Sequence, residues 1–367
     1  MCFYNMAGLT LKQTIKRNLF GIITIAISAI ILLIFLFAND GIGSLQRIAP
    51  SVSWEWLAAA VLLAVSIWFI EGITLNIFCK ILCPQWSFRY SFNIGLMGIL
   101  YSALTPFSTG GQPMQIFYMK RLGMDVGRGG SVIAMKTLVY QVIMVLSAIL
   151  MVVLRLGFFQ REVSNFSFLT IIGILCNGTF ITLLLLFTIS RKGTEKLLKK
   201  GLLLLHRIHL CKDPEGRYKK INAQLLLFHH GARLMGKNRR VYVQGVILTV
   251  LQIFVGYSVP YCLYRSFGFC EQDILTIMAA QAFVSLVSAF VPLPGASGGA
   301  EGSFYLFFSM FFTNGTIVPA VVLWRVLTYY FNIAAGAVAA GYVDRLKPIE
   351  MEREELAPAE TGYLPEE

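Results

Sequence analysis

The sequence predicts an all-α polytopic membrane protein with about six transmembrane helices and two oppositely oriented re-entrant helical hairpins that form an inverted repeat. Of the 367 residues, 56% are hydrophobic and only 14% are charged, and the mean hydropathy of +0.69 is higher than that of a soluble domain. Several apolar segments are long enough to cross a bilayer. Two further apolar segments are interrupted by glycines and prolines at matching positions.

Six segments have the length and composition of membrane spans. They are 19–37 and, approximately, 55–79, 131–154, 168–189, 241–264 and 316–343. The first follows Lys12, Lys16 and Arg17 and has no small-residue cleavage site. We therefore expect it to be a span and not a cleaved signal peptide.

Basic residues set the expected orientation of the spans. Residues 191–240 contain 14 Lys and Arg and three acidic residues, which gives this segment a net charge of +11. The whole chain carries +12, so nearly all of the net charge lies in this segment. This basic insert and both termini are expected to be cytoplasmic. Because spans flank the insert, anionic phospholipid is a better partner than nucleic acid. The final segment, 346–367, is acidic and is expected to be disordered.

The two interrupted segments are 92–119, which contains TPFSTGGQP, and 273–313, which contains PLPGASGGAE. Irregular backbone at membrane depth requires surrounding protein or a water-filled cavity. Each segment is therefore expected to be a re-entrant hairpin with its tip at the break. The flanking charges predict that the first opens to the cytoplasm and the second to the outside. The free amides that begin each returning helix favour an anion.

The two halves, about 50–155 and 241–345, align with each other. At an offset of 188, Pro106 matches Pro294, Gly110 matches Gly298 and Gly111 matches Gly299; at an offset of 189, Gln112 matches Glu301, Lys136 matches Arg325 and Tyr140 matches Tyr329. An inverted repeat with paired broken segments is typical of alternating-access carriers, in which those segments mark the binding site.

Charged residues inside the apolar segments point to the functional site. In one interpretation, Glu301–Arg325 and Glu71–Lys136 form pairs that hold the helices together. In the other, both cations face a shared cavity that accepts a phosphate, for which the planar fork of arginine is suited. The candidate head-group residues are Ser108, Thr109, Gly110, Gly111, Gln112, Lys136, Tyr140, Ser297, Gly298, Gly299, Glu301, Arg325 and Tyr329. Glu71 and Glu301 are the candidates for proton or ion coupling.

No motif of a familiar catalytic or metal site is present in the sequence. The phosphate-binding P-loop, the G-x-S-x-G elbow and the H-E-x-x-H pair are all missing. We interpret the His229–His230 pair as solvated. We therefore expect no catalytic residue, metal ion or cofactor.

Four stretches together resemble a known family: TPFSTGGQP, MQIFYMKRLG, PLPGASGGAEGSF and LWRVLTYY. They are similar to the flippase-like transmembrane domain of lysylphosphatidylglycerol synthases, the multiple peptide resistance factor proteins, over roughly residues 10–345. The resemblance implies transfer of aminoacylated phosphatidylglycerol, or another lipid with a phosphate head group, across the bacterial inner membrane. Gln112 and Lys136 depart from the family pattern, in which Glu and Arg are more frequent. Full-length members add a soluble aminoacyltransferase domain, which we do not expect after residue 345.

The predicted function is phospholipid flipping by alternating access. One alternative is a phosphatidylglycerol lysyltransferase-type enzyme or its membrane subunit, working with a separate lipid-synthesising enzyme. A small-solute carrier is the other. A lateral opening between spans would favour the lipid. The sequence leaves the head group, the coupling ion and the oligomeric state, including a homo-oligomer, open.

Overall fold

The computed structural model describes residues 52–162, 166–207, 213–289, 291–313 and 315–349, and four isolated positions before them, 26, 29, 30 and 33. Within these residues the chain is helical and has no strand, which confirms the all-α prediction. Five helices are long and apolar enough to cross a membrane: Trp54–Leu82, Val126–Arg155, Ile171–Ile189, Arg239–Ser266 and Ile317–Val343. They match five of the predicted spans. Apart from the four isolated positions, the predicted span 19–37 lies outside the described residues.

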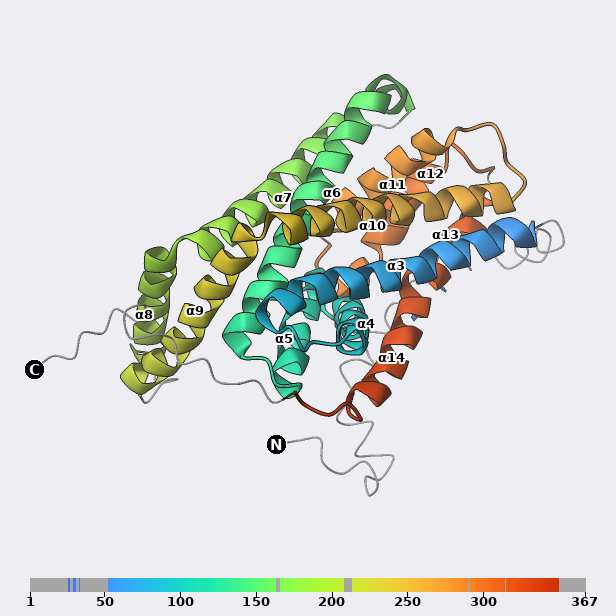
Figure 1. Ribbon diagram of the computed structural model, residues 1–367. Coiled ribbons are helices and arrows are strands. Elements are labelled where there is room, and N and C mark those ends of the chain that lie inside the picture. The colour runs from blue at the N-terminus through green and yellow to red at the C-terminus, as the bar shows by residue number, and fades with distance from the viewer. Residues whose placement is uncertain are drawn as a thin grey trace, which may run out of the picture.

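The described elements follow one another in the order drawn in Figure 1. They are α3 (Trp54–Leu82), α4 (Phe88–Leu104), η2 (Pro106–Ser108), α5 (Gly111–Arg121), α6 (Val126–Glu162), α7 (Phe166–Ile189), α8 (Arg191–Arg207), α9 (Pro214–Lys237), α10 (Arg239–Ser266), α11 (Ile274–Ser288), η3 (Pro294–Ala296), α12 (Gly299–Phe308), α13 (Ile317–Arg325), η4 (Val326–Tyr330) and α14 (Phe331–Val343).

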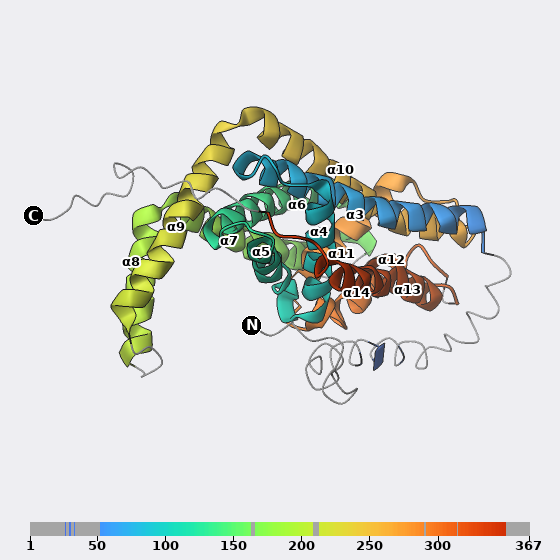
Figure 2. The ribbon, with the colours of Figure 1, turned by 60° about the horizontal axis from the view of Figure 1, so that its bottom comes forward.

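An antiparallel pair of long helices, α3 and α10, crosses the middle of the bundle (Figure 1). The Ser53 amide, just before α3, donates to the Ser266 carbonyl at the end of α10 at 2.8 Å. The basic insert contributes helices α8 and α9; α8 projects away from the bundle, whereas α9 runs back along α6 (Figures 1 and 2). The described part of the insert is thus helical.

The two interrupted segments fold as helical hairpins, α4–η2–α5 and α11–η3–α12. The open end of the first lies beside the end of α14, where Arg121 pairs with Asp344. The open end of the second lies near the far end of α6, where Arg155 pairs with Asp273 at 2.7 Å. Because Arg155 is roughly 40 Å along α6 from Val126, the hairpins open towards opposite ends of the bundle. The depth of their tips in the bilayer stays a prediction.

The tips of the two hairpins share an unusual backbone. Phe107 and Ser108 have φ angles of +53° and +54°, and Gly295 and Ala296 have φ angles of +58° and +55°. These are the residues that an offset of 188 places together. Left-handed conformations cost about 1–3 kcal/mol for residues other than glycine and gather at functional sites. The shared strain supports the sequence alignment of the tips independently of residue identity.

The two tips contact each other, η2 against η3, although they come from opposite halves of the chain. Their surroundings differ. The first tip is open, with Phe107 52% exposed, whereas Ala296 and Ser297 of the second tip are buried. Two hydrophobic clusters flank the contact, and each includes residues from the long helix of the other half. Met144 of α6 lies in the α10–α13 cluster, and Ala339 of α14 lies in the α3–α5 cluster.

Two features near the end of the described chain add to the sequence predictions. The predicted span 316–343 is not one continuous α-helix, because the π-helical turn η4 separates α13 from α14. The predicted disordered tail also begins with ordered residues, since the Ile349 amide donates to the Leu122 carbonyl at 2.9 Å. The rest of that tail, 350–367, lies outside the described residues.

We expect Gly111→Ala to lower the melting temperature of the purified protein. An added Cβ would lie 2.5 Å from the Gly98 carbonyl oxygen and 2.2 Å from the Ser102 hydroxyl, where α5 crosses α4. Such overpacking costs about 1–3 kcal/mol. The matched control is Gly178→Ala in α7, where a Cβ meets nothing within 4 Å. Equal melting temperatures for the two variants would contradict this close crossing.

Candidate functional site

The best-defined polar site is a buried ion pair beside the second hairpin tip. Arg325 ends α13 and Glu301 lies in the first turn of α12; they are 4% and 0% exposed. The Arg325 Nε donates to Glu301 Oε1 at 2.7 Å. Its Nη2 donates to the Gly295 carbonyl at 3.2 Å and to the Ser297 hydroxyl at 3.4 Å. One guanidinium thus holds both a carboxylate and the irregular backbone of the tip.

Glu301 is also fixed by the start of its own helix. Its Oε2 accepts a hydrogen bond from the Gly298 amide at 2.7 Å. A carboxylate in the first turn interacts favourably with the positive end of the helix dipole. Each carboxylate oxygen therefore has a partner, which compensates part of the cost of burying the charge.

Aromatic rings connect this pair to the first hairpin. The Arg325 guanidinium lies 4.7 Å from the ring centre of Tyr329 and 5.7 Å from that of Trp324. Such cation–π contacts favour a desolvated guanidinium. The Tyr329 hydroxyl donates to the carbonyl of Ala103, near the end of α4, at 3.2 Å. Gly295 fits beneath Tyr329, since a Cβ there would lie 2.1 Å from the ring.

The second intramembrane cation has its own carboxylate. Lys136 of α6 pairs with Glu71 of α3, and the other oxygen of Glu71 accepts from the Gln252 amide of α10 at 3.2 Å. Glu71 is 8% exposed. Three helices therefore meet at this carboxylate. Both pairs considered from the sequence are present, so each cation has a carboxylate partner in this structure.

The structure brings together only part of the predicted site. Arg325, Glu301, Ser297, Gly298 and Tyr329 form one connected group, as described above. Ser108 and Thr109 are exposed on the first tip, Gly110, Gln112 and Gly299 are half-buried, and Gly111 is buried against α4. Tyr140 is 38% exposed and does not occupy a buried position like that of Tyr329.

Two contributors to the site were not identified from the sequence. The first is Gln252, whose signal was an amide in the middle of the predicted span 241–264. The second is the π-helical turn η4, which directly follows Arg325 and contains Tyr329. Single π-helical turns occur frequently at functional sites.

Comparison with known proteins gives a consistent assignment. The family described as lysylphosphatidylglycerol synthase TM region matches residues 21–336. A UPF0104 membrane protein of Archaeoglobus fulgidus is 25% identical over 331 residues, covering 88% of this chain and 95% of that protein. A UPF0104 membrane protein of Methanothermobacter thermautotrophicus is 25% identical over 134 residues, covering 36% and 39%. With most of its length matched, this multi-pass membrane chain belongs to the lysylphosphatidylglycerol synthase transmembrane-region family.

Proposed function

We propose that the protein translocates a phospholipid by alternating access, and that Arg325 holds the lipid phosphate. The observation that carries this proposal is the buried Arg325–Glu301 pair. It lies beside the contact between the tips of two hairpins whose open ends face opposite ends of the bundle. Arginine binds phosphate through two parallel N–H donors. The start of α12 lies at the same place, and its Gly298 amide, which here donates to Glu301, would be a further donor once that carboxylate leaves. The acyl chains would stay in the bilayer during transfer.

A lipid phosphate can bind Arg325 only if it replaces the Glu301 carboxylate. A buried arginine without a partner costs about 3–5 kcal/mol, so the phosphate must arrive as the carboxylate leaves. Protonation of Glu301 would lower its hold on Arg325 and would couple lipid binding to a proton. Glu71, which holds Lys136 in the same manner, is the second candidate for such coupling.

The family assignment favours aminoacylated phosphatidylglycerol as the lipid, with other phosphate-containing head groups as alternatives. The proposed location is the bacterial inner membrane, with both termini and the basic insert in the cytoplasm. A role as the membrane subunit of a lipid-modifying enzyme would use the same phosphate site, but no observation favours it over transport.

Two exposed ion pairs are suited to be gates at the two ends of the bundle. Arg121–Asp344 joins the first hairpin to the end of α14, and Arg155–Asp273 joins α6 to the start of the second hairpin. Each pair therefore links one half to the other. Exposed pairs contribute only about 0–1 kcal/mol. They would therefore break and re-form easily as one end opens and the other closes.

Arg325→Gln alone is expected to lower stability by about 3–5 kcal/mol, because it leaves Glu301 buried without its partner. The double variant Arg325→Gln/Glu301→Gln should recover much of this stability but lose at least tenfold in translocation. Thermal unfolding gives the first result. Transfer of head-group-labelled phosphatidylglycerol and lysylphosphatidylglycerol in proteoliposomes gives the second. A stable double variant that translocates both lipids at the wild-type rate would exclude Arg325 as the phosphate ligand.

The first half should contribute less to transport than the second. Lys136 offers the phosphate a point charge, whereas the guanidinium of Arg325 offers parallel N–H donors. We expect Lys136→Arg to retain translocation and Lys136→Gln/Glu71→Gln to reduce it less than the Arg325 double variant does. The same proteoliposome assay ranks the variants. An equal or larger loss from the Lys136 double variant would place the main phosphate contact in the first half.

Cross-linking either gate should stop translocation reversibly. We propose the pairs Arg121→Cys/Asp344→Cys and Arg155→Cys/Asp273→Cys, in a background without the seven natural cysteines, joined by a cleavable bifunctional thiol reagent. Cleavage of the linker should restore transfer. The matched control is Glu215→Cys/Lys219→Cys, two exposed positions one turn apart within α9, so that the cross-link does not join the two halves. Undiminished transfer with either gate cross-linked would contradict alternating access.

A further inference from the structure

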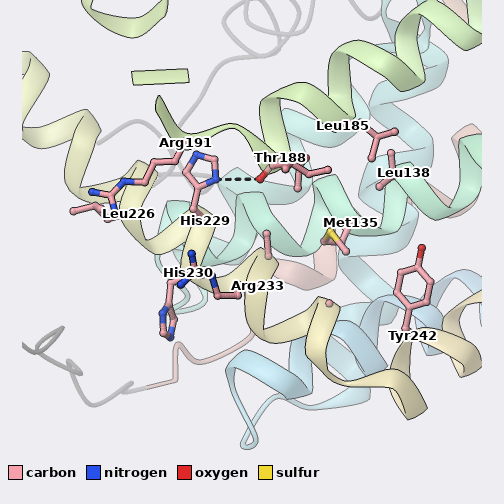
Figure 3. Close-up of a pocket in the computed structure, with 13 residues that line it drawn as sticks. Met135, Leu138, Leu185, Thr188, Arg191, Leu226, His229, His230, Arg233 and Tyr242 are labelled. Carbon is pink, nitrogen blue, oxygen red and sulfur yellow. Dashed lines mark hydrogen bonds between the residues drawn. The ribbon is translucent and has the colours of Figure 1, made fainter. Parts of the chain in front are cut away.

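A second amphipathic site lies away from the hairpin tips. An open cavity of about 830 Å³ is lined by α6, α7, α9, α10 and the first residue of α8 (Figure 3). Its apolar lining includes Met135, Leu138, Leu185, Ile189, Leu226 and Ala232. Three candidate spans contribute: α7 through its last residue, Ile189, α10 through Tyr242 in its first turn, and α6 through Met135, about 14 Å along the helix from Val126. The ends of α7 and α10 favour a position where hydrocarbon gives way to head groups.

Two arginines supply charge at the polar side of this cavity. Arg191 begins α8, two residues after the α7 span ends at Ile189, and Arg233 lies on α9 (Figure 3). Arg191 Nε donates to Glu195 at 2.8 Å, so one acid partly neutralises this side. Two guanidinium groups against one carboxylate leave a net positive charge beside an apolar wall.

His229 of α9 is part of the wall of the same cavity. Its Nδ1 donates to the Thr188 carbonyl of α7 at 3.1 Å (Figure 3), and its Nε2 is buried without a hydrogen-bond partner in the described part of the chain. Burial, together with the positive charge of Arg191 and Arg233, lowers the pKa of His229 despite opposing contributions from Thr188 and Glu195. The expectation of a solvated His229 is therefore wrong. A neutral imidazole also leaves anion binding to the arginines.

We infer that this cavity binds one anionic phospholipid from the leaflet that faces α8 and α9, with its phosphate on Arg191 and Arg233 and an acyl chain along the apolar wall. An anionic phospholipid matches both features of the cavity, its positive charge and its apolar lining. A soluble anion would leave the apolar wall exposed, and a lipid without net charge would leave the excess positive charge of the two arginines over Glu195 uncompensated. The inference does not depend on translocation, because the cavity is separate from the Arg325 site.

Direct lipid binding tests the charge. Purified full-length protein is titrated with phosphatidylglycerol and, separately, with phosphatidylcholine, and bound lipid is counted by native mass spectrometry. Arg191→Gln/Arg233→Gln should weaken phosphatidylglycerol binding at least tenfold. Lys219→Gln/Lys220→Gln, which removes the same charge from exposed positions on α9, should change it less than threefold. Equal losses in the two variants, or equal affinity of the wild type for both lipids, would overturn the inference.

Filling the cavity tests its shape without changing its charge. A Cβ at Gly236, which lines the cavity, and one at Gly201 of α8, which is not part of the lining, each meet nothing within 4 Å. Gly236→Trp should therefore fold and lose phosphatidylglycerol binding, while Gly201→Trp should retain it. A fall in melting temperature for Gly236→Trp with unchanged lipid affinity would assign the cavity to a segment of the protein itself and refute the lipid occupant.

Discussion

The buried Arg325–Glu301 pair is the interaction on which the arrangement of the second half depends. A charge at the centre of a membrane helix costs about 2.5–3.5 kcal/mol, and a buried charge without its partner costs about as much again. α13 must therefore keep its end against the first turn of α12. Because Arg325 also binds the Gly295 carbonyl and lies over Tyr329, which reaches Ala103, the same residue ties the second tip to the first hairpin.

The two halves use one backbone design with different chemistry. Both tips have two consecutive left-handed residues after a proline, yet only the second has a carboxylate in the following helix. Gln112 cannot neutralise Lys136, and Glu71 from α3 takes that role with support from Gln252. The halves thus offer sites of unequal strength: a forked arginine at a buried tip and a lysine near an open one. Such asymmetry suits a carrier that binds its cargo more tightly in one half.

Hydrophobic length alone was sufficient to predict five described spans, and the Gly and Pro breaks were sufficient to predict both hairpins as elements. The two ion pairs could also be predicted from the sequence, because few charged residues lie in apolar segments and each needs a partner. The π-helical turn was not predictable, since Val326–Tyr330 has an ordinary helical composition. Gln252 and His229 were missed because their roles depend on α10 lying against α3 and on α9 lying against α7, contacts between segments far apart in the chain.

A structure of the protein in lipid nanodiscs, determined at a pH low enough to protonate buried carboxylates, would show whether a lipid phosphate replaces Glu301 at Arg325. We expect head-group density between the two hairpin tips, with phosphate oxygens about 2.7–2.9 Å from the Arg325 guanidinium and Glu301 turned away from it. The acyl chains should extend between helices into the bilayer. Glu301 bound to Arg325 in every conformation, with lipid density only outside the bundle, would contradict the account and leave the pair as a purely structural clamp.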